Sequence, residues 1–265
     1  MTVPQQPRAE LVSLADALQS AVNFYRKKTS EIKIASPLSP PHVALTISWG
    51  AARNVDAVSI LAKTDELLVP AAWSNARAAC EVALRAIWLI HPADPMISYL
   101  RLLAIVEENQ RYHERMLKAA SPVSYLDRHE EASRELAQFL QRALPEIPQG
   151  YEYEPHIPTF DQIAEEIGAG QLRASYIEAS QYSHGKFAST ALYKRVDDVA
   201  SLMPVERVSL REWLYPLRIC WLCLRELGKF LTFRLSMETE QCAWSQHERE
   251  IEHLFKALAD ADPSE

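Results

Sequence analysis

The stretch AAWSNARAACEVALRAIWLI, residues 71–90, decides the fold class of this chain. Its apolar residues follow helical spacing, and its only charged residues are Arg77, Glu81 and Arg85, each four positions apart. At helical spacing Arg77 and Glu81 point within about 40° of each other, on the arc that also holds Trp73. We therefore expect one long, mostly buried helix in which an arginine is paired with a glutamate.

Helices are also expected on both sides of this stretch. The chain has 265 residues, of which 48% are hydrophobic and only six are glycine. A sequence poor in glycine has few residues that suit tight hairpin turns, whereas Ala, Leu, Glu and Arg favour helices. The sequence predicts an all-α bundle of about nine helices without a sheet, folded as a single domain over residues 1–265.

Prolines and glycines mark the ends of the expected helices. The patterns predict N- and C-terminal helices over 9–34 and 239–258, which pack on a core of about 42–237. Within that core, 42–68 is expected to be one helix. The stretch PEIPQGYEYEPHIP, residues 145–158, contains four prolines and cannot be regular. It is the expected boundary between two halves of the molecule.

A second polar pattern follows the first by about a hundred residues. Tyr176, Ser180 and His184 are four positions apart, so a helix through them stacks a phenol, a hydroxyl and an imidazole on one side. A buried glutamate such as Glu81 needs hydrogen-bonding partners from another helix, and these side chains can supply them. We expect the two helices to face each other.

The resulting cluster has a structural and a functional interpretation. In the structural one, it is a satisfied hydrogen-bond network that fixes how the helices pack. In the functional one, His184 is a general acid or base, and Arg77 and Arg85 bind the phosphate or carboxylate of a substrate. The candidate catalytic residues are then His184, Glu81, Tyr176 and Ser180. The residue types alone leave both interpretations open.

A basic ridge is expected on the long helix that begins near Ser209. Four cations on it lie within about 40° of arc at helical spacing. They are Arg211, Arg218, Arg225 and Lys229. The ridge could contact RNA or DNA phosphates or an acidic partner, or it could be a solvated face neutralised by neighbours such as Glu212 and Glu226. The opposite face is apolar and suits a core or a dimer interface.

Several other classes of function find little support in the sequence. The net charge of −7 argues against a protein-wide electrostatic attraction to nucleic acid. No cofactor is expected, because phosphate-binding glycine loops and nucleophile motifs are missing. No metal is expected either, because HExxH is absent and only Glu250 has a histidine, His253, three residues later, whereas a di-iron bundle needs this motif on two helices. Cys220 and Cys223 lie in an apolar stretch typical of buried cysteines. The N-terminus has no targeting pattern, so a cytoplasmic protein without membrane contact is expected.

The two polar patterns resemble those of a widespread, uncharacterised, all-helical bacterial family of unknown function. The resemblance covers about residues 40–235 and implies a fold and a polar signature. Some such helical proteins resemble the HEPN superfamily, whose ribonucleases place an arginine a few residues from a histidine on one helix. Here the nearest arginine before His184 is Arg173, eleven residues away, so Arg77 would supply the cation from another helix.

Two classes of function are consistent with these observations. The first is a binding or interaction protein, with a role in stress or phage defence implied by the resemblance. Its partner would be another protein or a second copy of the chain, and the ridge could add nucleic acid. The alternative is a nucleic-acid- or nucleotide-directed enzyme of the HEPN-like ribonuclease type, with His184 as general acid or base and Arg77 as phosphate clamp. A working active site must open to a cleft, whereas a structural cluster is closed and paired.

Overall fold

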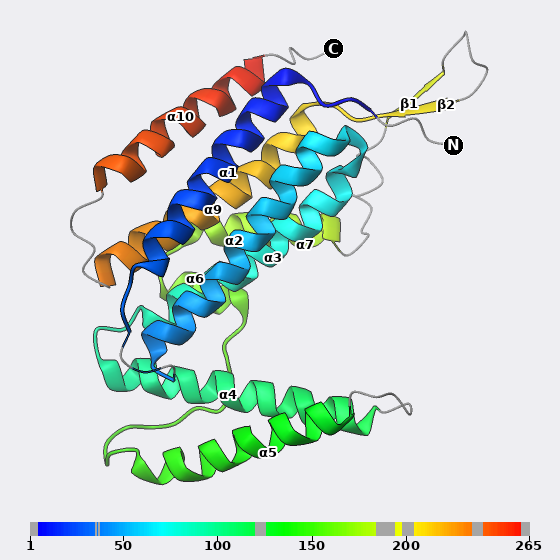
Figure 1. The fold of residues 1–265 in the computed structure, drawn as a ribbon. Helices are drawn as coiled ribbons and strands as arrows, with labels where there is room; N and C mark the ends of the chain where they lie inside the picture. The colour runs from blue at the N-terminus through cyan, green and yellow to red at the C-terminus, as the bar shows by residue number, and fades with distance from the viewer. Residues whose placement is uncertain are drawn as a thin grey trace.

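The computed structural model describes residues 5–34, 36, 38–119, 126–183, 194–197, 204–234 and 241–260. Within these ranges the protein is an all-α bundle with nine α-helices (Figure 1), which confirms the predicted fold class. One detail differs from the prediction of no sheet. A short antiparallel ribbon pairs β1 (Lys194–Asp197) with β2 (Pro204–Arg207). Val196 is in register with Val205, and valine has a high strand propensity.

The helices have well-marked ends. They are α1 (Ala9–Ser30), α2 (Pro40–Thr64), α3 (Val69–Ile90), α4 (Pro95–Lys118), α5 (Leu126–Ala143), α6 (Phe160–Glu166), α7 (Gly170–Ser183), α9 (Arg211–Arg234) and α10 (Gln241–Asp260), with 3-10 turns η1 (Glu66–Leu68) and η2 (Leu144–Glu146). The side chain of Asp94 caps α4, and Thr159 forms a capping box with Gln162 at the start of α6. None of the described helices is long and apolar enough to cross a membrane.

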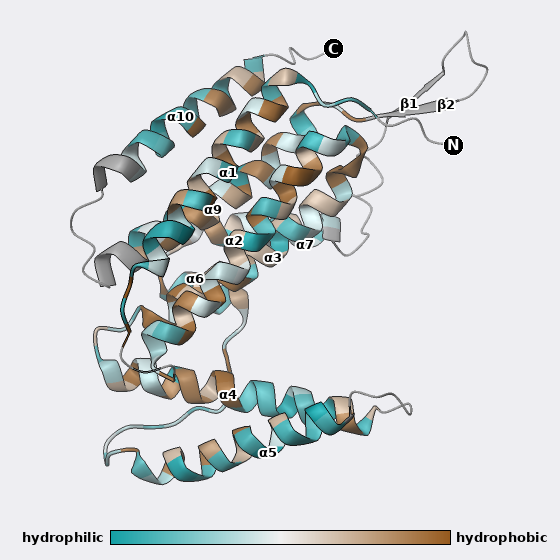
Figure 2. Ribbon diagram, in the orientation of Figure 1, coloured by the Kyte–Doolittle hydropathy of each residue, from teal (hydrophilic) through white to brown (hydrophobic). Residues whose placement is uncertain are grey.

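The core is built around α3. This helix packs against α2, α6, α7 and α9, and its Trp73, Leu84 and Ile87 side chains are fully buried. Hydrophobic residues lie where these helices face one another (Figure 2). The buried cysteines expected from the sequence are confirmed at Cys220 and Cys223. Outside this layer, α1 and α10 lie side by side, and α10 packs on both α1 and α9 (Figure 1).

A hairpin of α4 and α5 extends from one end of the bundle (Figure 1). The two helices pack mainly on each other, and both are largely hydrophilic away from the bundle (Figure 2). The stretch 145–158 leads back from α5 toward α6 and is irregular beyond η2. It is tied to α4, because the hydroxyls of Tyr151 and Tyr153 donate to Asp94 and Glu107, respectively.

Candidate functional site

The polar residues of α3 meet α7 along one side of the bundle. Arg77 Nη2 lies 2.8 Å from Glu81 Oε1, and the two side chains are 21% and 27% exposed. The guanidinium of Arg77 also lies 5.7 Å from the centre of the Tyr176 ring. The structure therefore brings together Arg77, Glu81 and Tyr176, three of the residues that the sequence placed in one cluster.

Arg85 lies further along α3 and faces different neighbours. Its Nη1 is 3.1 Å from Oε2 of Glu108 on α4, and its guanidinium is 5.6 Å from the Phe160 ring. The Phe160 ring packs in turn on Tyr176, with ring centres 5.4 Å apart. Both arginines of α3 are thus held by one carboxylate and one aromatic ring. Two cations and two anions balance each other in this cluster.

The other two expected members of the cluster are Ser180 and His184. The Ser180 hydroxyl donates to the backbone carbonyl of Tyr176 within α7, a bond that serine hydroxyls commonly make inside helices. The Ser180 hydroxyl therefore bonds within its own helix, whereas the sequence analysis expected it to donate to Glu81. His184 lies outside the described residues.

The basic ridge of α9 is largely neutralised by carboxylates of the same chain. Arg218 Nη1 lies 2.5 Å from Oε2 of Glu252 on α10. Glu226, on α9 itself, accepts hydrogen bonds from both Arg225 and Lys229, at 3.1 and 3.4 Å. Part of the ridge therefore has the character of a salt-bridged helix face, which was one of the two interpretations that the sequence allowed.

An open hollow of about 660 Å³ lies where the first half of α9 meets the end of α10. Two ridge residues, Arg211 and Arg218, line it together with Tyr215, whose ring is half exposed. The other lining residues are Glu212, Leu214, Phe255 and Ala259. The guanidinium of Arg218 lies 5.0 Å from the Phe255 ring. The hollow combines two guanidinium groups, one carboxylate, and aromatic and apolar side chains in one open place.

The exposed ring of Tyr215 is held in position by the core. It stacks on the fully buried Trp73 of α3, with ring centres 6.1 Å apart and an angle of 22° between the planes. Trp73 also stacks on Tyr182 of α7, with ring centres 4.0 Å apart. A ring fixed in this way loses little conformational freedom when a ligand contacts it.

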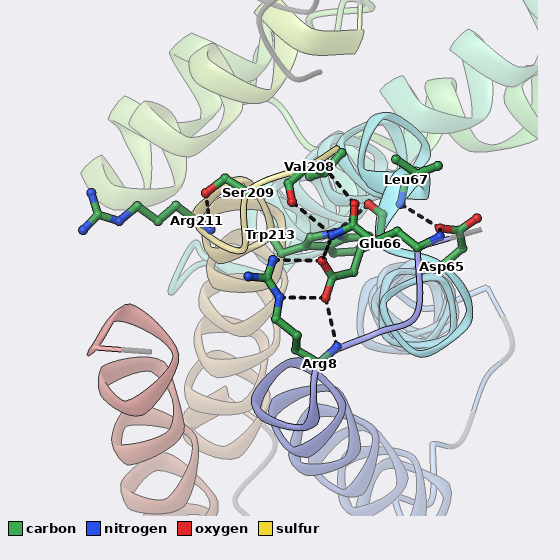
Figure 3. Close-up of polar contacts among 9 residues, drawn as sticks. Arg8, Asp65, Glu66, Leu67, Val208, Ser209, Arg211 and Trp213 are labelled. Carbon is green, nitrogen blue, oxygen red and sulfur yellow. Dashed lines mark hydrogen bonds and ion pairs between the residues drawn. The ribbon is translucent and has the colours of Figure 1, made fainter. Parts of the chain in front are cut away.

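The most buried carboxylate in the described part of the chain was not singled out by the sequence. Glu66 in η1 is 0% exposed. Figure 3 shows its polar contacts. Its Oε1 accepts from the backbone N–H and Nε of Arg8 at 2.9 and 3.0 Å, and its Oε2 accepts from Arg8 Nη2 at 2.8 Å and from Gln5 Nε2. Its backbone carbonyl accepts from Trp213 Nε1 at 2.9 Å. These bonds join three segments that are far apart in the sequence.

The cysteines and the other potential metal ligands of the described residues show no sign of a metal centre with three or more protein ligands or of a reactive thiol. Among the described residues, no group of three or more His, Cys, Asp or Glu side chains is arranged to hold a metal ion. Burial raises the pKa of the Cys220 and Cys223 thiols far above the usual range, with a smaller contribution from Cys80. A thiol that stays protonated is a poor nucleophile, so these cysteines are structural.

The α3 cluster lies in a part of the chain that matches a known protein family. The sequence profile of DUF5677, a family of unknown function, matches residues 47–200, a little over half of the chain. The chain belongs to this family. The expected membership of an uncharacterised helical family is thereby confirmed. The DUF5677 match contains Arg77, Glu81, Arg85 and Tyr176, whereas the ridge and the hollow follow it. No curated protein and no solved structure matches the chain.

Proposed function

We propose that the protein is a binding protein whose ligand docks in the hollow between α9 and α10. The composition of the hollow carries this proposal: Arg211, Arg218 and the exposed Tyr215 lie beside an apolar wall in a space of about 660 Å³. Ligand sites generally combine apolar walls with a few convergent polar groups. Because guanidinium groups favour carboxylates and phosphates, the ligand should carry an anionic group next to an apolar one.

The cluster on α3 has a structural role in this proposal. Arg77 is engaged with Glu81 and Arg85 with Glu108, so a substrate phosphate would have to displace a carboxylate that is already in place. The HEPN-like alternative, with His184 as general acid or base, requires that displacement at Arg77. Arg218 in the hollow is paired with Glu252 as well, so the space of about 660 Å³ beside it, and not the lack of a partner, distinguishes the hollow from the α3 cluster.

An acidic polypeptide segment is the ligand that these charges favour. Beyond the hollow, Glu226 accepts hydrogen bonds from Arg225 and Lys229, so a nucleic-acid backbone that follows the ridge would meet two cations that already have a partner. The net charge of −7 also repels an extended polyanion. A short acidic segment with one apolar side chain needs only the two arginines and the apolar wall. It would belong to another protein or to a second copy of this chain, and a role in stress or phage defence remains part of the proposal.

The fluorescence of 8-anilinonaphthalene-1-sulfonate tests the hollow directly, because this dye carries a sulfonate on an aromatic system. We expect saturable binding to the full chain and a loss of affinity of about tenfold or more in Arg211→Glu and in Tyr215→Ala. Lys229→Ala is the matched control, since Lys229 lies on the same ridge but does not line the hollow. Equal affinity in the wild type and both hollow variants would refute the proposed site.

Competition then identifies the class of ligand. A peptide of alternating glutamate and leucine should displace the dye from the wild type. A single-stranded RNA oligonucleotide of the same length should leave it bound. Displacement by the RNA but not by the peptide would overturn the protein ligand in favour of nucleic acid.

A further inference from the structure

Two histidines face each other across the α4–α5 hairpin. His113 of α4 and His129 of α5 approach with their Nδ1 atoms 2.8 Å apart and their ring centres 5.1 Å apart. Tyr112 packs edge-on against both rings, at 5.3 and 6.0 Å. Both histidines are partly exposed, so solvent reaches this part of the hairpin. Helix packing thus brings two imidazole nitrogens within hydrogen-bonding distance of each other.

Imidazole is the commonest metal ligand among side chains. The neighbouring Arg128 adds a positive charge close to the pair.

We propose that His113 and His129 bind a copper ion through their Nδ1 atoms. Two ligand atoms about 2.0 Å from a metal lie about 2.8–2.9 Å apart when they occupy adjacent square positions, but about 3.3 Å apart in a tetrahedron. The observed separation of 2.8 Å suits adjacent positions of the tetragonal geometry that Cu²⁺ prefers. Water would complete the coordination.

A thioether lies one helical turn after His113 on α4. Met116 follows His113 by three residues on α4, so its side chain lies on the same face of the helix, and it is 40% exposed. Thioethers favour Cu(I), and imidazole suits both copper states. Arg128 repels a cation at this position and limits the affinity. The same nitrogen separation also suits a hydrogen bond between two neutral rings, so the experiment has to separate the two.

Copper titration of the full chain distinguishes a copper site from a hydrogen bond between the two rings. We expect calorimetry with CuCl₂ to give one site that is weakened about tenfold or more by His113→Ala and by His129→Ala. His253→Ala is the matched control, because His253 is an exposed histidine on α10, and it should leave this site unchanged. Met116→Leu should weaken binding of Cu(I) while leaving Cu²⁺ affinity within about twofold. Unfolding curves of each variant verify that it folds.

Electron paramagnetic resonance of the wild type requires no variant. Bound Cu²⁺ should show hyperfine coupling to two imidazole nitrogens. The proposal is overturned if the spectrum shows fewer than two imidazoles, or if His113→Ala and His129→Ala bind Cu²⁺ as tightly as the wild type does. In that case the pair is a hydrogen bond between neutral rings that holds the hairpin together.

Discussion

Removal of the Arg8 side chain is the sharpest test of how the segments around Glu66 are joined (Figure 3). Arg8 donates two side-chain hydrogen bonds, at 3.0 and 2.8 Å, to a carboxylate that is 0% exposed. In Arg8→Ala the carboxylate keeps the backbone N–H of residue 8 and the amide of Gln5. It loses its only cation among the described contacts and remains buried.

The expected cost follows from the burial of the two partners. Removing one member of a fully buried ion pair costs about 3–5 kcal/mol, and a hydrogen bond to a charged group contributes about 1.5–3 kcal/mol. The Arg8 side chain is 39% exposed, so water already screens the pair and can reach the carboxylate in the variant. We therefore expect the free energy of unfolding to fall by about 2–3 kcal/mol. For a chain of this size that lowers Tm by roughly 5–10 °C.

Urea unfolding and calorimetry measure this loss, with Arg173→Ala as the matched control. Arg173 also donates two hydrogen bonds to one carboxylate, that of Asp161, at 2.6 and 2.9 Å, but these side chains are 42% and 45% exposed. That surface pair should contribute little to stability, because water screens exposed ion pairs. Adding Glu66→Gln to Arg8→Ala should recover part of the loss, because a neutral amide needs no cation. If Arg8→Ala costs no more than Arg173→Ala, the reasoning from burial is wrong.

Three further predictions concern other parts of the chain. Gly228→Ala would place a Cβ 2.8 Å from the Trp244 ring, so it should push α10 away, cost about 1–3 kcal/mol and alter tryptophan fluorescence. The lowered pKa of His113 means that the unfolded state binds more protons, so its contribution to stability is present above pH 6.5 and is lost as pH falls through the folded pKa. His113→Gln should remove that pH dependence of the urea midpoint. Cys220 and Cys223 should resist iodoacetamide until urea unfolds the protein, as peptide mass spectrometry would show.

Helix positions could be predicted because local rules decide them. Asp94 and Pro95 start α4 as capping rules predict, and α3 ends at Ile90 where its apolar pattern stops. The expected helix over 42–68 was too long, since α2 ends at Thr64. The cause is a contact from a distant segment: the backbone of residue 66 donates to Gln5, and Asp65 accepts from the backbone N–H of Gln5. Periodicity within 42–68 contains no information about a partner sixty residues away.

The same limit explains which parts of the α3 cluster were predictable. The pair of Arg77 and Glu81 is set by four-residue spacing within one helix, so the sequence was sufficient to predict it. Arg85 has the same spacing from Glu81, yet it turns to Glu108, because α4 crosses α3 at that turn. Spacing gives the face of a helix on which a charge lies. Only the packing of the neighbouring helix determines which carboxylate reaches it.

The ridge of α9 shows how packing changes the function that a charge pattern suggests. Four cations on one face indicate an extended polyanion when they are considered alone. In the folded protein, α10 brings Glu252 to Arg218 and places Phe255 beneath the same guanidinium, so this cation is both neutralised and held at the edge of the hollow. Arg211 and Arg218 line the hollow near the start of α9, whereas Arg225 and Lys229 lie further along the helix. A small, local anionic group therefore fits this surface better than a long one.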